Sequence, residues 1–176
     1  RAPQLVLGNV NYVKKVVFPL EILPVIQLVA AAFHGLVSVV VLLVAKLLFT
    51  GSLPVTALFF PLVIFPLLIL ILGLSWALAS LGVFARDVGQ TIGLITSVML
   101  FMSPVFFPIK SLPEPLQPWM RLNPLTFMIE QVREVLVWGH MPQWSGLLLY
   151  GVISLGVAWL GFSWFQKTRK GFADVL

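Results

Sequence analysis

The chain has 176 residues, of which 60% are hydrophobic and 10% are charged. A soluble globular domain is about half apolar and about a quarter charged, so too few polar residues remain here to cover a water-facing surface, and a soluble domain is excluded. The net charge of +5 would suggest nucleic acid as the partner of a soluble protein, but the basic residues lie mostly between apolar runs, which indicates membrane orientation instead.

Residues 1–21 form a polar and basic segment before the chain becomes apolar. The chain opens on Arg1 without a signal-peptide pattern, and we interpret it as a fragment that lacks its N-terminus. Lys14 and Lys15 precede Pro19, which breaks a helix, and Glu21 leads into the membrane. We therefore expect a short amphipathic cytosolic helix that is broken at Pro19.

Four apolar segments follow, and each approaches the roughly 20 apolar residues that a helix needs to cross about 30 Å of hydrocarbon. We predict membrane spans at residues 22–49, 55–84, 88–107 and 147–165. The third is shorter and more polar than the others. The sequence therefore predicts an all-α, polytopic bundle of transmembrane helices.

Two features inside these spans have alternative interpretations. The first span contains His34, and because no carboxylate lies above Glu21 in that span, we favour a neutral histidine bonded to a neighbouring helix over a proton relay. Gly89 and Gly93, four residues apart, either allow two helices to approach closely or occur by chance in a chain rich in small residues.

The connection at residues 108–146 is more than a simple loop. Prolines exclude a helix at its start: Pro108, Pro113, Pro115 and Pro118. Further along, Asn123 can cap a helix that has Pro124 at its first position and Gly139 after its last. This helix is too short to cross the bilayer, so we expect a re-entrant or interfacial helix on the outer side, or a surface helix packed on the bundle.

The distribution of basic residues predicts the orientation. If the four spans alternate, seven basic residues lie on one side: Arg1, Lys14, Lys15, Arg86, Lys167, Arg169 and Lys170. Four lie on the other side: Lys46, Lys110, Arg121 and Arg133. The side with more basic residues is expected to be cytosolic, which places both ends of the chain, including the tail at 166–176, in the cytosol. Lys46, near the outer end of its helix, can extend to the interface.

The sequence lacks the motifs of several kinds of catalytic site. It contains no G-x-x-x-x-G-K-[ST] phosphate loop and no H-E-x-x-H metal motif. It also contains no G-x-S-x-G nucleophile motif, and the absence of cysteine excludes disulfides and thiolate metal sites. We therefore expect no catalytic residue, no metal site and no cofactor in this chain.

Five pieces of the sequence carry a resemblance to one family. They are NVNYVKKVVFPLEILP (9–24), ARDVGQ (85–90), SPVFFP (103–108), the pair Asn123-Pro124, and GFADVL (171–176). In this order they resemble the ABC-2 type permeases, particularly those that export polysaccharides such as O-antigen, the polysaccharide part of lipopolysaccharide. The resemblance covers the whole chain. Such a permease has six spans after an interfacial helix, so the single domain at 1–176 is expected to hold four of the six.

The resemblance implies a non-catalytic subunit of an ATP-driven exporter in the bacterial cytoplasmic (inner) membrane. The permease is expected to form a homodimer with two separate ATPase subunits, which bind ATP and Mg, and to carry a lipid-linked glycan. We also expect contacts with membrane lipids, and we expect no binding of nucleic acid. A drug or other small-molecule ABC-2 exporter is the alternative, and a membrane glycosyltransferase or a secondary transporter fits less well.

The resemblance also implies a site that couples the permease to its ATPase. The residues we expect there are Lys14, Lys15, Phe18, Glu21, Arg86 and Asp87. Phe18 would be a buried anchor, and the charges would set register and specificity. Alternatively, Lys14 and Lys15 only bind anionic lipid, and for Arg86 and Asp87 we favour an ion pair within the chain over a partner contact.

Aromatic residues on the expected outer side suggest a substrate path, because sugars stack on aromatic faces. The residues we expect to line it are Phe101, Phe106, Phe107 and Trp119. For Trp138, Trp144 and Tyr150 we favour an interfacial aromatic belt, which is common in membrane proteins.

Overall fold

The structure, a computed structural model, describes residues 2–9, 19–85, 87–105 and 109–172. The described residues form helices and turns and no strand, which confirms the all-α class. The α-helices are α2 (Ile22–Thr50), α3 (Phe60–Phe84), α4 (Val88–Phe101), α5 (Gln117–Arg121), α6 (Pro124–Arg133) and α7 (Trp144–Thr168). Short helical turns are η1 (Ala2–Gln4), η2 (Leu7–Asn9), η3 (Val55–Phe59), η4 (Ile109–Ser111), η5 (Glu114–Leu116), η6 (Glu134–Trp138) and η7 (Arg169–Gly171).

Three helical segments of the described chain are long and apolar enough to cross a membrane, judged by length and composition. They are Ile22–Thr50, Val55–Phe84 and Trp144–Gly171. The shorter α4 has 14 residues, about 21 Å at 1.5 Å per residue, which is less than the hydrocarbon thickness. Three long helices and a shorter apolar one thus form the bundle.

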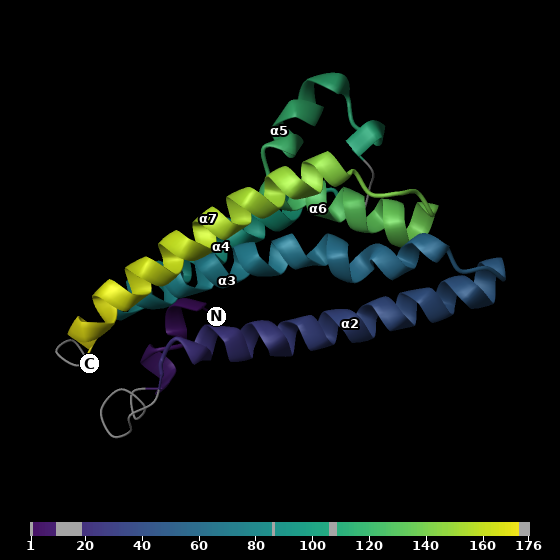
Figure 1. Ribbon diagram of the computed structural model, residues 1–176. Helices are drawn as coiled ribbons and strands as arrows, with labels where there is room; N and C mark the ends of the chain where they lie inside the picture. Colours follow the sequence, from purple (N-terminus) through teal and green to yellow (C-terminus); the bar gives the residue numbers. More distant parts are fainter. Residues whose placement is uncertain (1, 10–18, 86, 106–108, 173–176) are drawn as a thin grey trace.

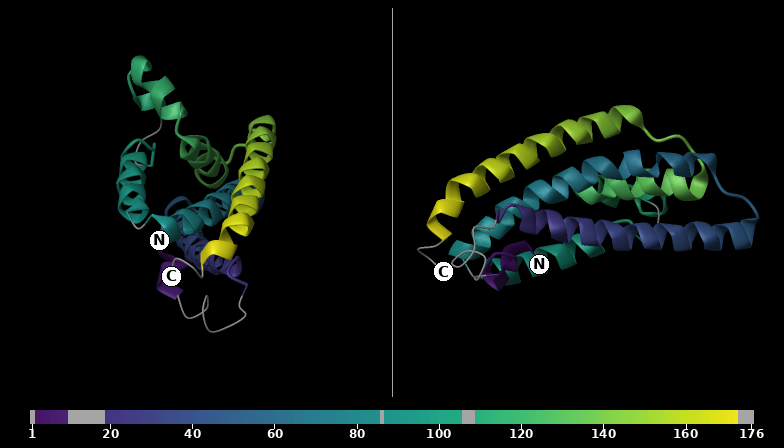
Figure 2. Two further views of the ribbon diagram at one scale, coloured as in Figure 1. Left: turned by 90° about the vertical axis from the view of Figure 1, so that its left-hand side faces the viewer. Right: turned by 60° about the horizontal axis from the view of Figure 1, so that its bottom comes forward.

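The long helices run side by side along the bundle (Figures 1 and 2). We call its two ends the Glu21 end, where α2 begins and α3 and α7 finish, and the Thr50 end, where α2 finishes and α3 and α7 begin. α6 lies alongside α3 near the Thr50 end, whereas α5 projects from the bundle (Figure 1).

Packing between α3 and α7 forms the centre of the bundle. Two glycines allow their backbones to meet: a Cβ atom added at Gly73 would lie 2.5 Å from Cα of Ala158, and one added at Gly161 would overlap the carbonyl of Gly73. Near the Glu21 end, the hydroxyl groups of Ser80 and Thr168 are 2.7 Å apart and hydrogen-bonded. Close van der Waals packing at small residues is the main attraction between helices in lipid, where the hydrophobic effect is absent.

Two apolar clusters flank this contact. The cluster at the Glu21 end consists of Val6, Ala79, Val83, Phe165 and Phe172. The cluster at the Thr50 end consists of Val63, Met128, Val135 and Leu147. The second cluster fixes α6 against α3 and α7, because Met128 and Val135 come from α6 and the turn that follows it.

In contrast, α2 packs loosely. Leu23 and Pro24 in its first turn are its buried residues, and between its ends lies an apolar groove of about 820 Å³ against α3, lined among others by Phe33, Leu36 and Phe65. A helix in lipid needs no apolar partner along its length. Its attachment therefore rests on its two ends.

The expected third span, residues 88–107, is α-helical as far as Phe101. Pro104 explains the end of the helix, because the residue before a proline disfavours helical geometry and proline has no N–H to donate. The hydroxyl of Ser103 donates to the carbonyl of Met99 at 2.6 Å and so satisfies one carbonyl group of the final turn. Residues 106–108 lie outside the described residues.

The glycine spacing noted in the sequence does not mediate packing within the described chain. A Cβ atom at Gly93 would have nothing within 4 Å, and one at Gly89 would meet only the side chain of Gln4 at 3.7 Å. The glycines that bring helices together are instead Gly73 and Gly161, on two different helices.

We predict that Gly161→Ala weakens the bundle, because the added methyl group would overlap the α3 backbone at Gly73. Overpacking of this kind costs about 1–3 kcal/mol. Thermal unfolding of the purified protein in detergent should show a lowered midpoint. The matched control is Gly156→Ala on the same helix, where an added Cβ has nothing within 4 Å; equal midpoints for the two variants would contradict the prediction.

Candidate functional site

The residues expected to couple to an ATPase are only partly described. Lys14, Lys15, Phe18 and Arg86 lie outside the described residues. Glu21 and Asp87 are described, and both lie at the Glu21 end, at the N-terminal caps of α2 and α4. The predicted ion pair between Arg86 and Asp87 therefore remains a prediction.

Glu21 is held by the rest of its own chain. The Nη1 group of Arg169 donates to both carboxylate oxygens, at 3.2 Å each. The backbone carbonyl of Glu21 accepts a bond from the indole Nε1–H of Trp76 at 2.9 Å. A partly exposed ion pair contributes only about 0–1 kcal/mol to stability, but these bonds fix the start of α2 to α3 and to the end of α7.

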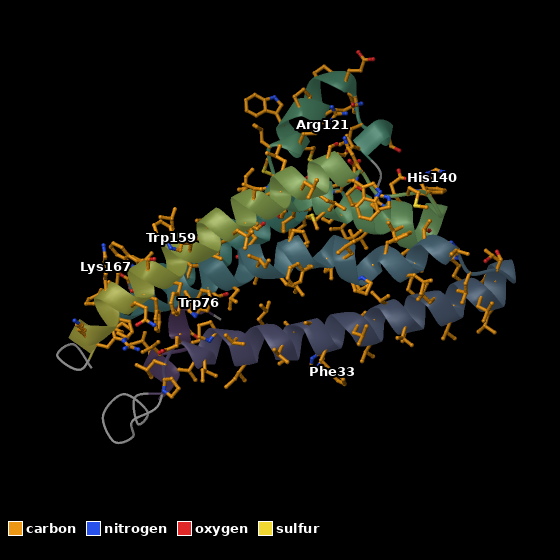
Figure 3. The ribbon with its side chains drawn as sticks, in the orientation of Figure 1. Phe33, Trp76, Arg121, His140, Trp159 and Lys167 are labelled. Atoms are coloured by element: carbon orange, nitrogen blue, oxygen red, sulfur yellow. The ribbon has the colours of Figure 1, made fainter. Side chains whose placement is uncertain are left out.

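Aromatic side chains pack next to these bonds at the Glu21 end. The ring of Trp76 packs edge-on against Phe162 at a centroid distance of 5.0 Å, and Phe165 packs edge-on against Phe172 at 5.6 Å. Leu20 and Trp76 both contact the apolar cluster at the Glu21 end. Leu20, just before α2, therefore packs on an apolar surface that contains aromatic rings, and Trp76 of α3 lies at the same end of the bundle (Figure 3).

Asp87 is exposed at the start of α4. Its backbone carbonyl accepts from the N–H groups of Gln90 and Thr91 at 3.1 and 3.2 Å, but its carboxylate makes no capping bond. A carboxylate at a helix N-terminus is favourable to the helix dipole. Its side chain is thus available at the surface of the Glu21 end.

The residues expected in a substrate path are exposed where they are described. Phe101, the last residue of α4, is 82% exposed, and Trp119 on the projecting α5 is 64% exposed. Phe106 and Phe107 lie outside the described residues. Within the described part of the chain, Phe101 and Trp119 make no contact with another aromatic ring. The structure therefore does not bring these two side chains together.

The helix predicted after the proline-rich stretch is present, with the predicted caps. The side chain of Asn123 accepts from the N–H of Leu125 at 3.0 Å, Pro124 is the first helical residue, and Gly139 adopts a left-handed φ of 76° after the last turn. The amide of Asn123 also donates to the carbonyl of Met99 at 3.1 Å and to the hydroxyl of Ser103 at 2.9 Å. One buried side chain thus connects the start of α6 to the end of α4.

The sequence did not indicate that this helix ends in a π-helical turn, η6, at Glu134–Trp138. The last carbonyls of a helix have no partner within it, and here other segments provide partners. The hydroxyl of Thr56 donates to the carbonyl of Val135 at 2.8 Å. The ammonium of Lys46 donates to the carbonyls of Leu136 and Val137, at 3.2 and 2.6 Å. These bonds attach η3 and the end of α2 to η6.

Further polar contacts fix the surroundings of α6. The guanidinium of Arg133 donates to the carbonyls of Pro104 and Val105 at 2.6 and 3.2 Å. His140 and Glu134 form an exposed pair, with Nδ1 and Oε2 2.5 Å apart. His140 lies near the Thr50 end, and Arg121 lies on the projecting α5 (Figure 3). Among these contacts, Lys46 and Arg133 place a cation against backbone carbonyls, an arrangement common for charged residues in membrane proteins.

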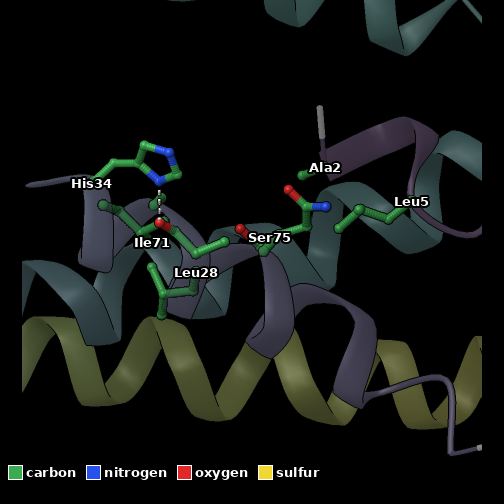
Figure 4. Close-up of a pocket in the computed structure, with 9 residues that line it drawn as sticks. Ala2, Leu5, Leu28, His34, Ile71 and Ser75 are labelled. Carbon is green, nitrogen blue, oxygen red and sulfur yellow. Dashed lines mark hydrogen bonds between the residues drawn. The ribbon is translucent and has the colours of Figure 1, made fainter.

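The expected partner of His34 is corrected by the structure. Its Nδ1 atom lies 2.8 Å from the carbonyl oxygen of Ala30 in the same helix, and not on a neighbouring helix. The side chain borders a cavity of about 470 Å³ between α2, α3 and η1, with Gln27 and Ser75 as further polar lining residues (Figure 4). A hydrogen bond within α2 thus satisfies Nδ1 of His34.

The described residues contain no group of three or more histidine, cysteine, aspartate or glutamate side chains that could hold a metal ion. The two carboxylates with ionic partners in this part of the chain, Glu21 and Glu134, lie at opposite ends of the bundle. The described residues therefore form two polar frames, one at each end of the bundle, and no assembled acid–base site. The frame at the Glu21 end consists of Glu21, Trp76 and Arg169, and the frame at the Thr50 end consists of Lys46 and Thr56 with the η6 carbonyls that they bond.

Comparison with known proteins assigns these features to a family. Residues 1–137 match the family described as ABC-2 type transporter. The chain is similar to two proteins of Klebsiella pneumoniae named O-antigen export system permease protein RfbA, with 26% and 25% identity over 97% of this chain and 66% of each relative. It is also similar to a Myxococcus xanthus protein of that name, with 24% identity over 91% of this chain and 62% of the relative. The chain thus spans about two thirds of the length of these relatives.

We predict that Asn123→Ala destabilises the protein by about 1–2 kcal/mol, because loss of an N-cap side chain has costs of this size. The variant also loses the bonds to Met99 and Ser103. Asn123→Ser is the matched control, since a serine hydroxyl can still cap the helix. Thermal unfolding should rank the wild type above the serine variant and the serine variant above the alanine variant; equal midpoints for all three would show that the cap is dispensable.

Proposed function

Because the chain belongs to the ABC-2 type transporter family, we propose that it acts in a permease subunit that exports polysaccharide across the bacterial cytoplasmic membrane. The observation that carries the proposal is similarity along 97% of the chain to proteins named as O-antigen export permeases. The family and the long apolar helices make the chain a multi-pass membrane protein and a transporter subunit. The cargo we propose is a lipid-linked O-antigen or a similar glycan.

The energy for transport comes, in this proposal, from a separate ABC ATPase that binds ATP and Mg. The permease itself is non-catalytic, consistent with a sequence that contains no phosphate loop. Two copies of the permease would form the exporter with two ATPase subunits. The exposed apolar surface of α2 is compatible with further protein or lipid contacts.

The two polar frames fit the two faces of such a permease. The sequence predicts seven basic residues on the side of the Glu21 end against four on the other side, and among the described residues Lys167 projects outward from α7 near the Glu21 end (Figure 3). By the excess of basic residues on cytoplasmic sides, we place this end in the cytosol, next to the ATPase. The segment from Lys14 to Phe18 and the exposed Asp87 would then contact the ATPase, with Glu21 at the junction between this segment and α2.

The Thr50 end would face the outside of the cell. There α6 lies alongside α3, and not across the end of the bundle (Figure 1), which supports a re-entrant helix over one lying in the membrane plane. Phe101, Phe106, Phe107 and Trp119 are the residues we propose for the outer part of the glycan path. Aromatic faces bind sugar rings at low cost in side-chain entropy.

We predict that deletion of the gene removes polysaccharide from the cell surface and leaves lipid-linked glycan inside the cell. The measurement is quantification of both pools in the same strain, with complementation by the full-length gene as the control. Normal surface glycan with no internal pool would contradict polysaccharide export and favour export of a drug or another small molecule.

We predict that joint replacement of Phe106 and Phe107 by alanine slows glycan export and leaves ATP hydrolysis in place, because the path would lose stacking surface without losing contact to the ATPase. Export and hydrolysis are measured on the complete exporter. Phe49→Ala is the matched control, since Phe49 is 90% exposed at the same end of the bundle. Export at the wild-type rate in the double variant would contradict a role of Phe106 and Phe107 in the glycan path and would favour their assignment to an interfacial aromatic belt.

A further inference from the structure

A long-range polar connection at the Glu21 end joins α2, α3 and α7. The carboxylate of Glu21 accepts from Arg169, and its backbone carbonyl accepts from Trp76. Glu21 and Arg169 are 148 positions apart in the sequence. We call the three residues Glu21, Trp76 and Arg169 the joint.

The position of the joint gives it a mechanical role. Glu21 directly follows Pro19 and Leu20 and occupies the N-cap position of α2, so it lies between the proposed ATPase-contacting segment and the membrane-spanning helix. Leu20 and Trp76 rest on the apolar cluster that includes Phe165 of α7. A displacement of the segment before α2 therefore acts on α3 through Trp76 and on α7 through Arg169.

The charges of the joint suit the helix ends that carry them. Glu21 stands at the N-terminus of α2, and Arg169 follows the last turn of α7. Negative charge is favoured at the first position and positive charge at the second by the helix dipoles. The pair therefore aligns the start of one helix with the end of another, and reversing one charge opposes both its partner and its own helix.

Because the side chains of Glu21 and Arg169 are partly exposed, an effect of mutation on coupling can be distinguished from an effect on folding. The side chains of Glu21 and Arg169 are 24% and 44% exposed. An ion pair with this much solvent contact contributes little to stability, so a charge reversal is expected to leave the bundle folded. A carboxylate already bonded by its own chain is also a poor candidate for direct recognition of a partner protein.

We propose that Glu21 and Arg169 are positioning residues that transmit movement of the ATPase-contacting segment to α3 and α7. This assigns Glu21 to the inside of the permease and leaves contact with the ATPase to the residues before it. The inference rests on the proposed function, because it assumes that an ATPase drives the segment.

The test compares Glu21→Arg, Arg169→Glu and the double exchange in the full-length permease with its ATPase. We expect each single reversal to lower export at least fivefold, roughly the lower limit of a typical coupling between sites, while the ATPase still co-purifies. The double exchange should restore most of the export. Lys167→Glu, the same charge reversal at an exposed position two residues earlier in the last turn of α7, is the control and should export normally.

A second readout needs no glycan. The chain contains no cysteine, so spin labels can be attached to single cysteines at Ser52 and Ser145, both exposed at the Thr50 end. We expect ATP to change the distance between the labels in the otherwise unmodified protein, the change to be lost in both single reversals, and the double exchange to restore it.

Three outcomes would overturn the inference. An ATP response that persists in both single reversals would show that the pair transmits nothing. Loss of ATPase co-purification that the double exchange does not restore would make Glu21 a direct contact. The absence of any ATP response in the unmodified protein would remove ATP-driven transport itself, and so separates failure of the proposed function from failure of the joint.

Discussion

Helices in a membrane attract each other over short distances, so the approach of α3 to α7 at Gly73 and Gly161 determines where every other element can lie. Neither position has room for a side chain. With the two backbones in contact, α3 and α7 together support the two apolar clusters, one that includes Val6 and Phe172 and one that includes Met128 of α6. The glycine contact thus fixes the pair α3 and α7, and α2 is attached to this pair at its two ends.

Polar groups carry out that attachment differently at the two ends. At the Glu21 end a carboxylate meets a guanidinium and an indole N–H donates to a carbonyl. At the Thr50 end an ammonium and a hydroxyl satisfy carbonyls left open by η6. The first arrangement depends on two charges that can be exchanged; the second depends on backbone groups that no substitution in η6 removes. Breaking the second arrangement therefore requires substitution of the donors, Lys46 or Thr56.

Local features of the fold could be predicted from the sequence, and long-range ones could not. The caps at Asn123, Pro124 and Gly139 were predictable because a cap is determined by its own neighbours in the chain. The pairing of Glu21 with Arg169 joins residues 148 positions apart, and no local pattern indicates it. The packing glycines were missed for a related reason: spacing within one helix does not reveal which face meets another helix.

The π-helical turn η6 has a consequence for the length of the chain around it. Each of its hydrogen bonds closes over one more residue than in an α-helix, so the turn accommodates a residue that a regular helix would exclude. Removing one residue from Glu134–Trp138 would restore α-helical register and rotate the following residues by roughly 100°, one residue's share of a 3.6-residue turn. The carbonyls bonded by Thr56 and Lys46 would then point elsewhere. This part of the protein is consequently far less tolerant of a deletion than of most substitutions.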